Sequence, residues 1–198
     1  MARMLVTGVW LVLLDGIFFA PWWSGDADPG DELIRNTVRL SLLYYAAAAL
    51  LMMWLRPGEW DASSVRGNVA RDAWSLAWLA YVVHVLFAMK FAHHWSHAHA
   101  VQHTQERSGF GAGIYVSHLF SIVWTVDVLW WWLRPAGYAR RSPWVDRVLH
   151  AFMAFIVFNG TVVFECGWIR WAGVVMFVVL GGCFVYRQFG ERLPRTAY

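Results

Sequence analysis

The sequence is short of charged residues, which make up only 15% of its 198 positions. A soluble domain is usually about one quarter charged, so this deficit argues against a soluble protein. Hydrophobic residues account for 59% of the chain, and 15 of them are tryptophan, which is favoured where lipid tails meet headgroups. The composition therefore indicates an integral membrane protein.

Lysine is almost absent, because Lys90 is the only one beside 15 arginines and 13 acidic residues. The net charge of +3 is scattered along the chain without a basic run. This pattern excludes the concentrated positive surface of a nucleic-acid-binding protein. We therefore expect no nucleic-acid partner and interpret the basic residues as charges that orient the chain in a bilayer.

Cysteine is also scarce, with only Cys166 and Cys183. Two cysteines cannot supply a disulfide framework or a four-cysteine zinc site, and their expected separation in depth places them beyond disulfide reach. The sequence also lacks the nucleophile elbow of hydrolases, the P-loop and the dinucleotide-binding glycine fingerprint. These absences exclude several common classes of soluble enzyme.

Long apolar runs, in contrast, fill most of the chain. Six segments are long and hydrophobic enough to cross about 30 Å of hydrocarbon as helices, and Pro and Gly mark several connections between them. The segments run approximately over 4–23, 33–55, 69–92, 112–133, 146–165 and 168–187. We therefore predict one all-α integral membrane domain over residues 1–198, a polytopic bundle of about six transmembrane helices.

The positions of the arginines predict how this bundle is oriented. One side carries Arg3, Arg56, Arg66, Arg71, Arg134, Arg140, Arg141, Arg147, Arg187, Arg192 and Arg195. By the positive-inside rule that side is cytoplasmic, so we expect both termini in the cytoplasm and residues 93–110 outside it. We expect a multi-pass protein of a bacterial cytoplasmic (inner) membrane, surrounded by lipid bilayer. Its candidate partners are other membrane subunits or an extracytoplasmic redox protein.

A cluster of imidazoles follows the third apolar segment, where five of the eight histidines fall within eleven positions. They are His93, His94, His97, His99 and His103. One interpretation is a wet interfacial helix whose histidines bind water and headgroups. The other is a transition-metal site, which the density of the cluster favours because only three histidines lie elsewhere in the chain.

The spacing of these histidines suggests two sets of ligands if residues 93–107 continue as a single helix. The two faces would then carry His93, His94 and His97 on one side, and His99, His103 and Glu106 on the other. The second set follows an i, i+4, i+7 pattern, with which a helix offers a metal two imidazoles and a carboxylate. A bend near Ser96 or Gly109 would join the two sets in a dinuclear site, with His118 as a further ligand.

The functional prediction is an integral membrane metalloprotein with an extracytoplasmic histidine-rich site, either a redox enzyme or a metal-handling component. Imidazole suits iron and copper, with zinc less favoured, and open coordination positions would allow oxygen chemistry. Whether the protein is a metal-dependent membrane oxidoreductase is left open. A non-catalytic role as a subunit of a membrane complex is an alternative.

A second alternative is a haem-b electron carrier. His84 and His118 lie at nearly the same expected depth on consecutive antiparallel segments, and alanines surround His84 on its helix face. A flat wall of small residues suits a macrocycle, and a pair of facing imidazoles can ligate haem iron axially. The competing interpretation is that the two histidines make hydrogen bonds that pack the helices.

Four further polar residues fall inside the predicted apolar segments, where ionisable groups are usually functional. They are Asp15, Asp127, Asn159 and Glu165. We interpret Asp15 and Asp127 either as steps in a proton or ion path or as partners of an arginine, tryptophan or hydroxyl on a neighbouring helix. Asn159 and Glu165 belong to the outer half, where Glu165 is a candidate oxygen ligand.

Overall fold

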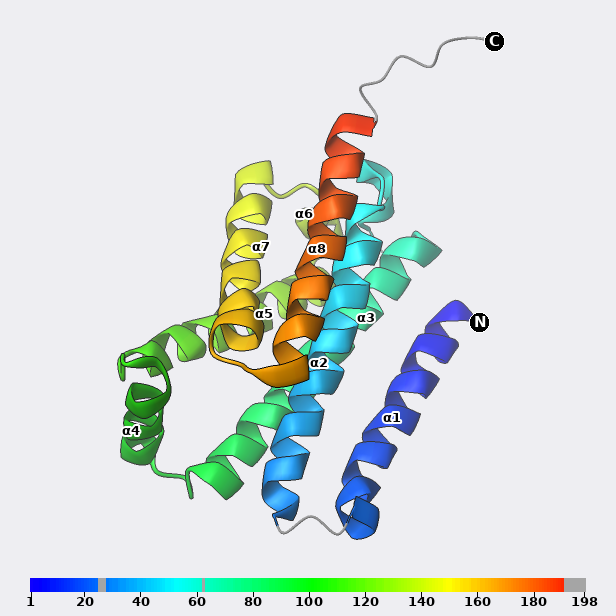
Figure 1. Ribbon diagram of the computed structural model, residues 1–198. Coiled ribbons are helices and arrows are strands. Elements are labelled where there is room, and N and C mark those ends of the chain that lie inside the picture. Colours follow the sequence, from blue (N-terminus) through cyan, green and yellow to red (C-terminus); the bar gives the residue numbers. More distant parts are fainter. Residues whose placement is uncertain (25–27, 62, 191–198) are drawn as a thin grey trace.

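The computed structural model describes residues 1–24, 28–61 and 63–190, and the regular secondary structure within these ranges is entirely helical. Six long helices form a bundle (Figure 1). They are α1 (Ala2–Ser24), α2 (Pro29–Met53), α3 (Val65–Phe87), α5 (Gly113–Leu133), α7 (Pro143–Phe158) and α8 (Gly167–Gly190). The short elements are η1 (Pro57–Glu59), α4 (His97–Ser108) and α6 (Pro135–Ala139), and two π-helical turns, η2 (Ala88–Ala92) and η3 (Asn159–Val163), continue α3 and α7.

Six of these helices are long and apolar enough to cross a membrane, which confirms the expected all-α polytopic bundle. The candidate spans are Ala2–Pro21, Pro29–Met53, Val65–Ala92, Gly113–Leu133, Pro143–Val163 and Gly167–Phe189. Their ends lie within about four residues of the expected ones, and the largest shifts are at the starts of α2 and α3. The chain is therefore a multi-pass membrane protein.

The two ends of the bundle carry different short elements, and we name them the α4 end and the α6 end (Figure 1). At the start of α1, the Arg3 guanidinium makes two hydrogen bonds to the Asp72 carboxylate on α3, at 2.6 and 3.0 Å. At the end of α8, Arg187 donates to the carbonyl of Leu55, which follows α2. The start of α1 and the end of α8 therefore both lie at the α6 end.

Capping residues explain where several helices begin. The side chains of Asp28, Ser64, Ser96 and Ser142 accept hydrogen bonds from backbone N–H groups in the first turns of α2, α3, α4 and α7. Proline stands at the first position of α2 and α7, where its missing N–H leaves no helical bond unmade. These capping side chains and prolines mark where the connections end and where α2, α3, α4 and α7 begin.

The small-residue face of α3 packs against α2. Ala73, Ala77 and Ala80 on α3 are fully or almost fully buried, and Ser41 of α2 donates to the carbonyl of Ala77 at 2.9 Å. Small residues let two membrane helices approach closely. The alanine face that suggested a macrocycle wall is therefore occupied by a neighbouring helix.

Candidate metal site at the α4 end

The chain does not continue as one helix through the histidine cluster, which corrects the assumption behind the two predicted ligand sets. The π-helical turn η2 ends α3, and His94 and Trp95 then adopt left-handed backbone conformations with φ of 49° and 61°. Ser96 is extended and caps α4. A bulky residue such as Trp95 is rare at positive φ, and strain of this kind is concentrated at functional sites.

This tight turn brings His93 back against α4. Its Nδ1 lies 3.4 Å from Nδ1 of His99, and its ring centroid lies 5.3 Å from that of His103. The ring of His94 is farther away, 6.5 Å from that of His99. His93 therefore pairs with His99 from the other predicted face and lies near His103, in a combination that a continuous helix would not allow.

A second pair forms between α4 and α5. His97 Nε2 lies 3.3 Å from Nε2 of His118, and the two rings are stacked with centroids 5.5 Å apart. Tyr115, one turn before His118, packs beside both rings. The expectation that His118 joins the cluster agrees with this contact, whereas Tyr115 was missed although its i, i+3 spacing to His118 was visible in the sequence.

The nitrogen–nitrogen distances of both pairs suit chelation of a metal. Two imidazole nitrogens bound at about 2.0–2.1 Å to a tetrahedral ion lie about 3.3–3.4 Å apart. In the metal-free protein the same contacts are within hydrogen-bonding distance, with one ring of each pair donating its N–H to the other. Burial, and then the nearby charges of His103, His99 and His94, lower the pKa of His93 below its usual 6.5. The neutral imidazole that metals require is therefore favoured at this position.

Other predicted ligands lie outside these pairs. Glu106 accepts a hydrogen bond from Gln102 at 3.0 Å, and Glu165 forms an ion pair with Arg107 at 3.7 Å. Across residues 1–24, 28–61 and 63–190, no three His, Cys, Asp or Glu side chains form a group that could hold a metal ion. The structure thus presents two histidine pairs, and the His99, His103 and Glu106 set is not assembled.

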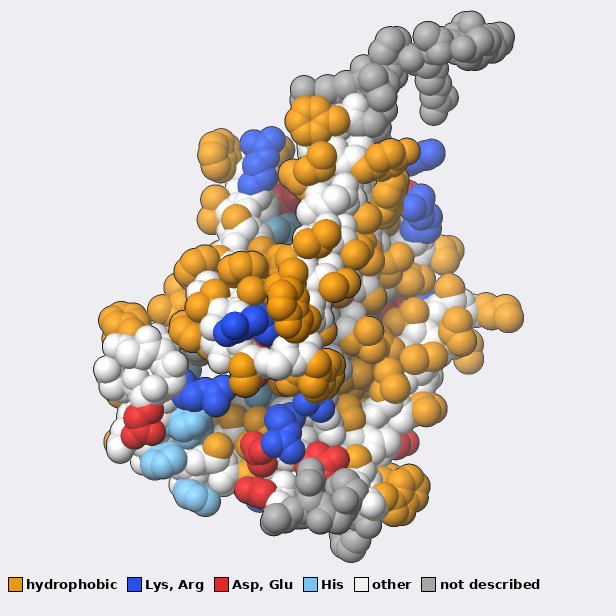
Figure 2. Space-filling view, viewed as in Figure 1, with side chains coloured by type: hydrophobic (Ala, Val, Ile, Leu, Met, Phe, Trp, Pro, Cys, Tyr) orange, Lys and Arg blue, Asp and Glu red, His pale blue; other side chains and the backbone are white. Residues whose placement is uncertain are grey.

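The histidines gather on the outer surface of the α4 end (Figure 2). The side chains of His97, His99 and His118 are exposed, whereas His93 is partly buried. Both π-helical turns, η2 and η3, lie at this end of the bundle. Such turns are rare and occur frequently at functional sites, so their position is consistent with a site here.

His84 and His118 do not share a partner. His84 Nδ1 lies 3.0 Å from the carbonyl oxygen of Ile34 on α2, whereas His118 faces His97. The interface of α3 with α5 is closed by two hydrogen bonds, which join Tyr81 to Ser121 and Trp78 to Thr125. Side chains of α3 and α5 therefore contact each other directly. They leave no flat slot between these two helices of the kind that a haem would require.

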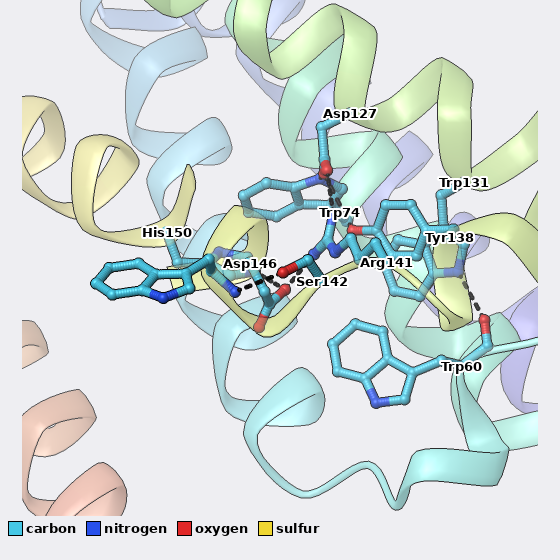
Figure 3. Close-up of polar contacts among 10 residues, drawn as sticks. Trp60, Trp74, Asp127, Trp131, Tyr138, Arg141, Ser142, Asp146 and His150 are labelled. Carbon is cyan, nitrogen blue, oxygen red and sulfur yellow. Dashed lines mark hydrogen bonds and ion pairs between the residues drawn. The ribbon is translucent and has the colours of Figure 1, made fainter. Parts of the chain in front are cut away.

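Asp127 is the centre of a buried polar network near the α6 end (Figure 3). One carboxylate oxygen accepts from Trp74 Nε1 at 2.9 Å and from the Tyr138 hydroxyl at 3.1 Å, and the other pairs with Arg141 at 2.6 Å. Arg141 continues to Asp146, which approaches His150. The interpretation of Asp127 as a partner of arginine, tryptophan and hydroxyl groups is confirmed.

The two other polar residues inside the spans have different surroundings. Asn159 donates to the carbonyl of Phe155 one turn earlier, at the start of the π-helical turn η3. Asp15 is exposed on α1, and no hydrogen bond or ion pair joins it to any residue that the structure describes. Of the two interpretations given for Asp15, the one that pairs it with an arginine, tryptophan or hydroxyl on a neighbouring helix therefore has no support among the described residues.

Comparison with known proteins assigns no family to this arrangement. No protein-family model, curated protein or solved structure matches the chain. The chemistry of the site is therefore argued from its own geometry.

Proposed function

We propose that the protein is a membrane metalloprotein that binds transition-metal ions through the two histidine pairs of the α4 end, one ion at each pair. The observation that carries the proposal is the pair of nitrogen–nitrogen distances, 3.4 Å for His93 and His99 and 3.3 Å for His97 and His118. The proposal is also supported by the concentration of five of the eight histidines within eleven positions at this end. His103, next to His93, is the nearest additional imidazole for the first pair.

Copper is the metal that this donor set favours. The donors are neutral imidazoles, and the affinity of nitrogen sites for divalent metals peaks at Cu²⁺. Iron in oxygen-activating sites commonly takes a carboxylate beside two histidines, and here Glu106 contacts Gln102 instead. The nitrogen–nitrogen distances themselves match a tetrahedral zinc site. Cu²⁺ prefers a tetragonal geometry in which neighbouring nitrogens lie about 2.8 Å apart, so copper binding requires the paired rings to move closer together.

A metal-handling role is favoured over a redox enzyme. An enzyme that activates oxygen excludes water from its reactive centre, whereas His97, His99 and His118 are exposed. Two protein ligands per ion leave coordination positions open for capture and release. The proposed site faces the extracytoplasmic side, since the arginine-rich α6 end is assigned to the cytoplasm by the positive-inside rule.

The haem alternative has less support from the geometry. Bis-histidine ligation would require His84 to leave the Ile34 carbonyl and His118 to leave His97. It would also separate the hydrogen-bonded interface of α3 and α5. An optical spectrum of the purified protein distinguishes the two, because the haem form has a Soret band and the copper form does not.

Copper titration of the purified protein tests the proposal. The double variants His93→Gln with His99→Gln, and His97→Gln with His118→Gln, each remove one complete pair. We expect each to lose one of two copper ions, or to lower copper affinity by about 100-fold, equivalent to about 2.7 kcal/mol. His150→Gln is the matched control, because it removes an imidazole at the α6 end.

The wild-type protein is first stripped of metal with a chelator and then titrated. The proposal fails if this protein binds neither copper nor zinc. It also fails if the His150→Gln control and both double variants bind the same amount of copper with the same affinity. Thermal unfolding of the metal-free variants checks that they keep the fold.

A further inference from the structure

An acidic side chain in the middle of α1 points away from the bundle. Asp15 lies about 140° around the helix from Trp10, the buried residue that anchors α1 by donating to the Leu76 carbonyl at 3.1 Å. It is exposed, and no described residue pairs with it. In a membrane this side chain would face lipid.

The depth of Asp15 makes this exposure unfavourable. It lies six residues before Pro21, the end of the candidate span, so it is about 9 Å inside the hydrocarbon. A short aspartate side chain cannot reach the headgroups from there, unlike the long side chains of lysine and arginine. Charged groups inside membranes almost always face a protein interior or a partner.

The residues around Asp15 follow the pattern of a helix contact. Leu5, Gly8, Val12, Asp15 and Phe19 are spaced 3, 4, 3 and 4 residues apart, which is the seam of two packed helices. Leu5, Val12 and Phe19 are 67%, 71% and 58% exposed. A Cβ at Gly8 would meet nothing within 4 Å, so a second helix has room to approach there.

The two arginines of α2 near this depth have other contacts. Arg35 and Arg39 lie six and ten residues from Pro29, where the candidate span of α2 begins, or about 9 and 15 Å inside it, and Arg35 forms an ion pair with Asp31. The Arg39 guanidinium instead lies 5.0 Å from the ring centroid of Trp168 and donates to Asn36. A second copy packed symmetrically on α1 would place two carboxylates together without a cation.

We propose that the outer face of α1 binds a transmembrane helix of a different polypeptide that carries lysine or arginine at the depth of Asp15. The basic side chain pairs with Asp15, and the 3–4 seam packs along the rest of the partner helix. The α1 helix lies at the edge of the bundle beside α2 and α3, so this face is open for docking (Figure 1). The inference is independent of the metal proposed at the α4 end.

Association in lipid vesicles tests this inference. The full-length protein is reconstituted with a synthetic 23-residue leucine-rich helix that carries one central lysine, and association is measured by energy transfer between fluorescent labels. An otherwise identical helix without lysine is the reference. We expect the lysine helix to bind wild-type protein at least tenfold more tightly than the reference, and Asp15→Leu to abolish this preference.

Thr7→Leu is the matched control, a polar-to-leucine change on α1 that should keep the preference. The inference is overturned if both probe helices bind wild-type protein equally, or if Asp15→Leu retains the preference for lysine. It is also overturned if the protein self-associates without a probe and Asp15→Leu abolishes that self-association, because the face would then belong to a second copy. Unchanged copper binding by Asp15→Leu separates this outcome from failure of the metal site.

Discussion

At the scale of single residues, the backbone at His94 and Trp95 determines which imidazoles meet. Two consecutive left-handed residues reverse the chain after η2, so that His93 lies against His99. A continuous helix would have left His93 about one and two-thirds turns away from His99, on a different face. The strained turn therefore creates the first histidine pair.

The titration of His93 gives a prediction at this scale. Because its pKa is lowered below 6.5 in the folded protein, the unfolded chain binds more protons at this residue. The contribution of neutral His93 to stability is therefore present above about pH 6.5 and is lost as the pH falls through the lowered pKa. In the metal-free protein, we expect the difference in Tm between wild type and His93→Gln to shrink from pH 7.5 to pH 5.

Thermal unfolding in detergent at these two pH values measures the effect. A difference in Tm that stays constant, or grows in acid, would show that His93 is not held neutral by its surroundings. Because the metal-free protein is used, competition between protons and copper does not enter the comparison.

At the scale of elements, close packing of α8 against η3 holds the last helix in place. A Cβ added at Gly173 would lie 2.9 Å from Cβ and Oγ1 of Thr161, a buried residue that donates to the Val157 carbonyl. A Cβ at Gly181, on the same helix, would meet nothing within 4 Å. The two glycines thus form a matched pair for measuring this contact.

We expect Gly173→Ala to lower the free energy of unfolding by about 1–3 kcal/mol, because the clash moves α8 away from η3. Gly181→Ala should be neutral or stabilising by up to about 1 kcal/mol, because alanine favours the helix more than glycine does. Denaturation in mixed micelles compares the two variants with wild type. Equal destabilisation by both would contradict the contact.

The elements themselves could be predicted from the sequence, whereas their side-chain partners could not. The hydropathy of the chain and the Pro and Gly residues between its apolar runs located all six spans, because lipid requires long apolar helices. The left-handed turn at His94 and Trp95 has no such signal, since neither residue is a glycine. The pairing of Asp127 with Arg141 also depends on tertiary packing, because the chain after α6 must fold back against α5.

At the scale of the whole molecule, the two ends of the bundle carry different kinds of ionisable group. The α6 end contains the buried network of Asp127 and Arg141 and the ion pair of Arg3 with Asp72, whereas the α4 end carries the exposed histidines. This division could be predicted from the sequence because arginine positions follow the connections between spans. The direct partners of Asp127 are Trp74, Tyr138 and Arg141, so Asp127 and Asp15 share no contact.

Topology reporters test the orientation proposed for this division. A reporter fused after Arg107, at the α4 end, should report an extracytoplasmic location, and a fusion at the C-terminus should report the cytoplasm. The physical reason is the excess of arginine at the α6 end. A cytoplasmic signal from the Arg107 fusion would place the histidines inside the cell and exclude capture of extracytoplasmic metal.

The central claim is that histidine pairs at the α4 end hold a metal ion. Pulsed electron paramagnetic resonance of the Cu²⁺-loaded protein tests it most directly, because the technique detects imidazole nitrogens bound to copper. We predict at least two histidine nitrogens per copper ion in the wild type, and loss of that signal from the affected site in each double variant. Copper bound only by oxygen ligands, or the same nitrogen signal in wild type and both double variants, would contradict the account.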